Sequence, residues 1–130
     1  MNTKEIGEKS EAIILAHLIK LGYSVSLPFG DNQRYDMIID KRNGKLLRAQ
    51  CKTGKFKNGI IDFNTCSKNR DTNEPLNYRG QIEIFLIYCP DLDKVYEVDV
   101  NKAPLNSMFL RVDNPKLSNS KINWAKDFEI

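Results

Sequence analysis

The chain has 130 residues, of which 41% are hydrophobic and 28% charged, and its formal net charge is +3. These values are typical of a soluble globular protein, and we expect one domain over residues 1–130. No window of the sequence approaches the roughly 18 consecutive apolar residues that a membrane-spanning helix needs, so we expect none. The polar N-terminus lacks the apolar segment of a signal peptide, which predicts a cytoplasmic protein. The mild positive charge permits nucleic-acid binding but does not argue for it.

The first predicted element is a helix from about Thr3 to Leu21, followed by Gly22 as a C-terminal cap. Its apolar residues recur at helical spacing: Ile14, Leu15, Leu18 and Ile19. Extending this stripe back by one turn reaches Glu11, so the helix carries a carboxylate on its inward face. A solvated acid near the helix N-terminus, favoured by the helix dipole, is the alternative interpretation.

After a short predicted strand over residues 23–28, the segment from Tyr35 to Lys52 predicts a hairpin around Asn43-Gly44. A two-residue turn would mix apolar and polar residues on both faces. A three-residue loop over residues 42–44, with Gly44 left-handed in a bulge, gathers the apolar residues on one face. The hydrophobic pattern therefore selects the second register. It places Asp36 opposite Gln50, with Lys52 two residues further along the same face.

This polar group has the chemistry of a metal site. A carboxylate oxygen from Asp36 and the side-chain carbonyl of Gln50 are ligands of the kind that Mg²⁺ prefers, with Mn²⁺ as an expected substitute. Glu11 is the candidate third ligand. Lys52 can orient or deprotonate an attacking water and balance the charge of a phosphorane-like transition state. We therefore predict Glu11, Asp36, Gln50 and Lys52 as the catalytic set.

The order of Glu11 on an early helix, Asp36 on one strand and Gln50-Cys51-Lys52 on the next resembles the PD-(D/E)XK nuclease superfamily. With GEKSEAIILAHLIKLGYSVSLPFGDNQRYDMIID, QCKTGK and NYRGQIEIFLIYCPDLDKVYEVDV, the chain is similar to the small branch that includes group I intron homing endonucleases. The resemblance covers nearly the whole chain. It implies an α/β fold with a mixed central sheet flanked by helices, and Mg²⁺-dependent hydrolysis of DNA that leaves a 5′-phosphate.

Gln50 departs from the pattern, because most of the superfamily has Asp or Glu at this position. The departure removes one negative charge, which should weaken metal affinity and leaves open whether one ion or two bind. Glutamine does occur here in the homing-type branch, so the departure does not by itself imply a loss of activity.

Further along the chain, residues 59–63 and 82–89 predict strands, the second of them central and buried on both faces. Residues 95–100 predict the last strand, and residues 121–130 a short amphipathic segment packed on the body. Residues 65–77 are polar and basic, which predicts a loop. We expect seven residues to contact DNA, the basic ones by neutralising phosphates and the tyrosine by packing on a sugar or base. They are Arg34, Lys55, Lys57, Lys68, Arg70, Tyr78 and Arg79. A merely solvated charged loop is an equal alternative.

The leading hypothesis is a sequence-specific homing endonuclease acting on double-stranded DNA. A structure-selective nuclease such as a Holliday-junction resolvase is one alternative, and a DNA-binding protein on a degenerate nuclease scaffold is another. Cutting both strands needs two active sites related by symmetry, so a homodimer or homotetramer is predicted. The segments after Val95, with Trp124 and Phe128, are the expected contact surface.

Overall fold

The computed structural model describes residues 1–114 and 121–130. Its main sheet has five strands, which are β1 (Ser24–Ser26), β2 (Met37–Asp40), β3 (Leu46–Thr53), β8 (Ile84–Cys89) and β9 (Lys94–Asp99). Their order in the sheet is β1-β2-β3-β8-β9, and only β3 and β8 run parallel. The fold is therefore α/β with a mixed central sheet, as predicted. The predicted central strand is confirmed, because every residue of β8 is buried.

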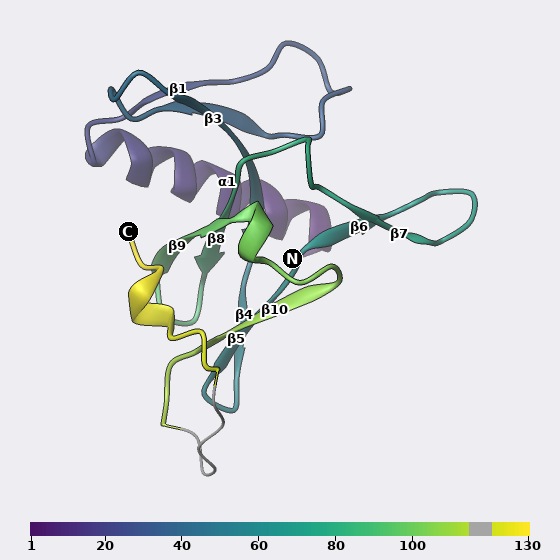
Figure 1. Ribbon diagram of the computed structural model, residues 1–130, viewed down its shortest axis with the longest axis vertical. Coiled ribbons are helices and arrows are strands. Elements are labelled where there is room, and N and C mark those ends of the chain that lie inside the picture. The colour runs from purple at the N-terminus through teal and green to yellow at the C-terminus, as the bar shows by residue number, and fades with distance from the viewer. Residues whose placement is uncertain (115–120) are drawn as a thin grey trace.

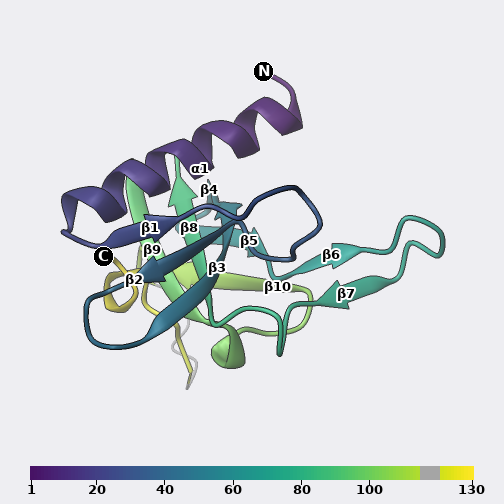
Figure 2. The same ribbon diagram turned by 90° about the horizontal axis from the view of Figure 1, so that it is seen from above.

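The long helix α1 (Thr3–Lys20) covers one face of this sheet (Figures 1 and 2). The Asn2 side chain caps it by accepting a hydrogen bond from the backbone N–H of Glu5. The buried residues Ile14 and Leu18 pack against Met37, Ile39 and Ala49, which alternate inward from β2 and β3. The predicted helix is thus confirmed, with Glu11 one turn before its buried stripe.

The opposite face is covered by a second sheet rather than by a helix. Its strands, in spatial order, are β10 (Ser107–Arg111), β5 (Ile60–Asn64) and β4 (Lys55–Lys57). Phe63 and Leu110 pack there against Phe85 and Ile87 of the main sheet. Strand β10 corrects the prediction that residues 95–100 form the last strand. Burial alternates along it, with Met108 and Leu110 buried and Phe109 exposed, but because the exposed residue is also apolar the sequence shows no two-residue period.

The prediction of a loop over residues 65–77 is also wrong, because β6 (Cys66–Lys68) and β7 (Pro75–Asn77) pair as a hairpin. This hairpin, residues 66–77, projects from the body as a separate two-stranded sheet and is called the arm below (Figures 1 and 2). The Asn69 side chain accepts hydrogen bonds from the N–H groups of Asp71 and Thr72 at its tip. Local turn chemistry thus forms a hairpin that has no apolar alternation.

The predicted β2–β3 register is confirmed, because Met37 pairs with Ala49 and Ile39 with Leu47. Gly44 is left-handed at a φ of 86°, as expected. The loop differs in length, since residues 41–45 are unpaired and Arg42 also has a positive φ of 64°. The Asp40 side chain supports that conformation by accepting the backbone N–H of Arg42.

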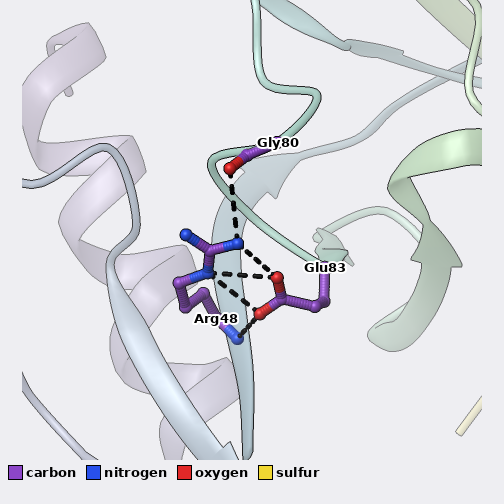
Figure 3. Close-up of polar contacts among 3 residues, drawn as sticks. All are labelled: Arg48, Gly80 and Glu83. Atoms are coloured by element: carbon purple, nitrogen blue, oxygen red, sulfur yellow. Dashed lines mark hydrogen bonds and ion pairs between the residues drawn. The ribbon is translucent and has the colours of Figure 1, made fainter.

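An ion pair fastens the start of the parallel β3–β8 pairing. The Glu83 carboxylate accepts bonds from the backbone N–H of Arg48 at 2.7 Å and from its Nε at 3.0 Å, while Gly80 supplies a carbonyl oxygen (Figure 3). The Arg48 guanidinium lowers the pKa of Glu83. Glu83, directly before β8, thus joins that strand to β3.

The C-terminal segment packs on the body as predicted. It contains the short helix η2 (Ala125–Asp127), while another short helix, η1 (Val100–Lys102), follows β9. Phe128 packs against the core under the second sheet, and Ile130 against the helix side. No helix in the described part of the chain is long and apolar enough to cross a membrane.

Candidate active site

Asp36 lies directly before β2, where the hairpin begins. Its backbone N–H donates to the carbonyl of Ala49 at 2.8 Å, which extends the pairing by one residue. Its carboxylate Oδ2 accepts the backbone N–H of Cys51, also at 2.8 Å. The side chain is therefore held by the neighbouring strand through one oxygen. Within the described residues, Oδ1 makes no hydrogen bond, which leaves it free to face a ligand.

Glu11 and Asp36 line one cleft. It has a volume of about 320 Å³ and is completed by the loop between β1 and β2, with Leu27, Pro28, Gly30, Asp31, Gln33 and Tyr35. Burial raises the pKa of Glu11, and the negative charges of Asp36 and Glu8 raise it further. Burial also raises the pKa of Asp36, against the opposing effects of the Cys51 N–H and the Lys52 charge. Both carboxylates are thus disfavoured in their charged form, a situation that a bound cation relieves.

Gln50 projects from β3 and is only partly exposed. Its Nε2 donates to the backbone carbonyl of Arg34 at 3.2 Å. Because the amide nitrogen is engaged in this way, the carbonyl oxygen Oε1 is the atom left to act as a ligand. A glutamate could not make the same bond, since it has no donor when ionised.

Lys52 is two residues further along β3. Its Nζ lies 3.3 Å from the hydroxyl oxygen of Tyr78 and 4.9 Å from the centroid of that ring. Burial raises the pKa of Asp36, and the positive charge of Lys52 partly offsets that rise, so the two groups interact electrostatically. Asp36 is therefore the common neighbour of Glu11 on the helix side and Lys52 on the strand side.

The donor set fits a hard divalent cation, although its members are not all in one cleft. Gln50 and Lys52 do not line the cleft of Glu11 and Asp36. In residues 1–114 and 121–130, no three His, Cys, Asp or Glu side chains gather in a metal-binding group. Two carboxylates and one oriented amide oxygen supply the oxygen ligands that Mg²⁺ takes, with room left for water and phosphate. The raised pKa values of Glu11 and Asp36 agree with a site whose carboxylates a bound cation would stabilise in their charged form.

The predicted DNA contacts fall into two groups. Exposed cations lie on β4, on the arm and directly after it: Lys55, Lys57, Lys68, Arg70 and Arg79. Of these, Arg79 also donates from Nη2 to the Ala103 carbonyl at 3.0 Å. Tyr78 is only 4% exposed and packs edge-on against Phe85, which argues against contact of its ring with a sugar or base. Arg34 is engaged with the arm, where its Nη1 donates to Ser67 Oγ and its Nη2 to the Asn77 carbonyl. These contacts argue against a role for Arg34 in binding phosphate.

Two features of the site escaped the sequence analysis. Ser10 is buried and hydrogen-bonds Thr53, and Tyr78 is an interior partner of Lys52. Ser10 could have been found, because it lies four residues before Ile14 on the same helix face. The environment of Tyr78 depends on contacts between distant segments, which local periodicity does not report.

A mixed sheet with an acid on the first helix, and with Asp36, Gln50 and Lys52 on the adjoining hairpin, is the architecture of a PD-(D/E)XK nuclease. The chain matches the PD-(D/E)XK endonuclease family over residues 1–130 and belongs to that family. Its structure is similar to that of the bacterial homing endonuclease I-Ssp6803I, with a TM-score of 0.78 and 21% sequence identity. The likeness covers 99% of this chain and 89% of that chain and shows a shared fold. No curated protein matches the sequence.

Proposed function

We propose that this nuclease is a sequence-specific, Mg²⁺-dependent DNA endonuclease of the homing type. The observation that carries the proposal is the position of Asp36, which shares a cleft with Glu11 and lies within electrostatic reach of Lys52. An acid pair with raised pKa values beside a lysine suits the binding of a cation and a scissile phosphate together. The free cysteines, Cys51, Cys66 and Cys89, suit the reducing cytoplasm, where we place the enzyme.

In this mechanism Asp36, Glu11 and the Gln50 carbonyl would hold the cation. When bound, Mg²⁺, or Mn²⁺ in its place, supplies a Lewis acid for the phosphate and lowers the pKa of a water. Lys52 orients the attacking water and offsets the negative charge that develops on the phosphate. The Cys51 N–H keeps Asp36 aligned during the reaction, and the products carry a 5′-phosphate.

The exposed cations supply the surface for the rest of the duplex. Lys55 and Lys57 lie on β4, Lys68 and Arg70 on the arm, and Arg79 directly after it. We propose that they contact phosphates, which positions the DNA without reading its sequence. Each loss should weaken binding and reduce its salt dependence by about one ion.

Supercoiled plasmid and a randomised duplex library test the function. The wild-type protein should nick or cut with Mg²⁺, produce a preferred sequence from the library, and stop when the metal is chelated. Asp36→Asn should abolish cleavage, because it removes the charge of a metal ligand. It should leave DNA binding intact, because the lost charge is negative and faces phosphate. Asp91→Asn, in an exposed turn away from the cleft, is the matched control and should cut normally.

Each remaining alternative has its own outcome in these assays. Preferential cutting of a branched junction over random duplex would indicate a structure-selective nuclease instead. Tight DNA binding without any metal-dependent cleavage would indicate a DNA-binding protein, the possibility that the amide of Gln50 raises.

We also propose that the enzyme acts as a homodimer or homotetramer, because one chain carries one active site. Phe128 of the predicted contact surface packs against the core, and residues 115–120 lie outside the described residues. Phe109, with 56% of its surface exposed on β10, is the better candidate contact. Light scattering at micromolar concentration should show more than one chain, and Phe109→Ser should shift the protein towards monomer. Concerted cutting of both strands by a persistent monomer would refute the assembly.

A further inference from the structure

We propose that Arg34 is a positioning residue that links the arm to the catalytic residues Gln50 and Lys52. The inference rests on the proposed nuclease function and deepens it, by giving the arm a role in the geometry of the active site. Three separate groups of Arg34 take part: its guanidinium edge, its guanidinium face and its backbone carbonyl.

The edge of the guanidinium holds the arm. Its Nη1 donates to Ser67 Oγ on β6, and its Nη2 donates to the backbone carbonyls of Leu76 at 3.3 Å and Asn77 at 3.0 Å on β7. A fourth bond runs from Nε to Gln81 Oε1 at 2.7 Å, directly beyond the arm. One side chain thus touches both strands of a hairpin that otherwise forms its own sheet. The planar fork of arginine presents five N–H donors in a rigid geometry, which lets one side chain make all of these bonds at once.

The face of the guanidinium lies over Tyr78, with its central carbon 4.0 Å from the ring centroid. The ring is buried and meets Phe85 at right angles, with 5.6 Å between centroids, so it has little freedom to move. Its hydroxyl oxygen accepts the hydrogen bond of Lys52 Nζ. Arg34 therefore supports the residue that orients the catalytic amine.

The backbone carbonyl of Arg34 accepts the Gln50 amide, which determines which end of that amide can reach a metal. A shift of Arg34 therefore reaches Lys52 through Tyr78 and reaches Gln50 directly. The arm carries the exposed cations Lys68 and Arg70, so the arm is where the phosphate backbone of DNA would bind. Arg34 therefore connects the binding of DNA on the arm to the positions of the catalytic residues Gln50 and Lys52.

The first experiment measures the link without any cleavage assay. In Arg34→Met, trypsin should cut the arm after Arg70 about ten-fold faster, the scale expected when charge-assisted hydrogen bonds are lost. The ¹⁵N resonance of the Lys52 amine, assigned by its loss in Lys52→Met, should shift in the same variant. Arg42→Met is the matched control, because that guanidinium bonds the Gly22 carbonyl far along the chain from the arm. It should leave both signals unchanged.

The second experiment uses Tyr78→Phe, which keeps the buried ring and removes only the oxygen. It should lower kcat by about ten-fold, as expected for one hydrogen bond to a charged group, while the Kd for DNA stays at the wild-type value. Arg34→Lys, which keeps the charge but not the fork, should reproduce the faster trypsin cut. If Arg34→Met fails to fold, these two variants still decide the matter.

The outcomes separate this proposal from the proposed function. Release of the arm with an unmoved Lys52 resonance, or wild-type kcat in Tyr78→Phe, would overturn the link while leaving the nuclease intact. A wild-type protein that cuts no DNA would overturn the nuclease. The trypsin and resonance measurements would then still report whether Arg34 joins the arm to Lys52.

Discussion

Ser10 Oγ lies 2.6 Å from Thr53 Oγ1, at a partly buried contact between α1 and β3 in which the Ser10 side is fully buried. Ser10 directly precedes Glu11, and Thr53 directly follows Lys52. The hydrogen bond therefore fastens the helix to the strand next to two residues of the candidate active site. It sets the offset between the helix and the strand through two residues that are 43 positions apart in the sequence.

Removing one side of this pair should destabilise the fold. Ser10→Ala leaves the Thr53 hydroxyl without its partner and should lower the free energy of unfolding by about 1–3 kcal/mol. Adding Thr53→Val should cost less than the sum of the two single changes, because no polar group is then left unpaired. Urea unfolding of the four proteins measures the coupling, with exposed Ser26→Ala as a neutral control. Strict additivity would show that the two hydroxyls do not interact.

The carboxylate pair should lower stability in the absence of metal. Because the folded pKa of Asp36 is raised, the folded state binds its proton more tightly than the unfolded state does. Its contribution to stability therefore falls as pH rises from the ordinary carboxyl pKa through the raised folded value. Asp36→Asn keeps an acceptor for the Cys51 N–H but loses the charge.

Without divalent cations, Asp36→Asn should accordingly be more stable than wild type at pH 7.5. The difference should shrink as the pH is lowered through the folded pKa of Asp36. Denaturant unfolding in chelator across pH 4–8 measures the difference in the free energy of unfolding between the two proteins. The other acids are the same in both, so their contributions largely cancel in this difference. A variant less stable than wild type by the same amount at every pH would contradict this account.

Lys52 should matter far more than its neighbour Lys55. Lys52→Met keeps the apolar stem and loses the charge, so cleavage should slow by on the order of 10²-fold or more, as for other electrostatic catalytic groups. Lys55→Met, on exposed β4, should mainly weaken DNA binding. Single-turnover rates at saturating protein separate the two effects. Equal losses of rate would reduce Lys52 to one of the phosphate contacts.

Gln50→Glu should change metal affinity and turnover in opposite directions. The added charge should lower the Mg²⁺ concentration needed for half-maximal activity. The maximal rate should fall, because glutamate cannot donate to the Arg34 carbonyl and sets a negative oxygen against it. A Mg²⁺ titration of the cleavage rate reads both values. An unchanged midpoint would show that Gln50 is not a ligand.

Much of the main sheet could be predicted because its signals are local. The two-residue alternation across Met37, Ile39, Leu47 and Ala49 permits only one register that buries a single face, and the structure has that register. The continuous apolar run around residues 84–89 indicated a strand buried on both sides. The arm and β10 were missed, because polar turn chemistry and one outward-facing Phe109 obscure their period.

The sequence by itself determined the helix with Glu11 and the two strands next to which Asp36 lies and on which Gln50 and Lys52 lie, because periodicity encodes them. The order of these motif residues also carried the resemblance to the family. Only the tertiary structure decided what each group touches. Tyr78 is inside the protein, beneath Arg34 and beside Lys52, because the parallel pairing of β3 with β8 brings Phe85 next to Gln50. Burial and hydrogen-bond partners arise from segments far apart in the chain, so no local pattern can report them.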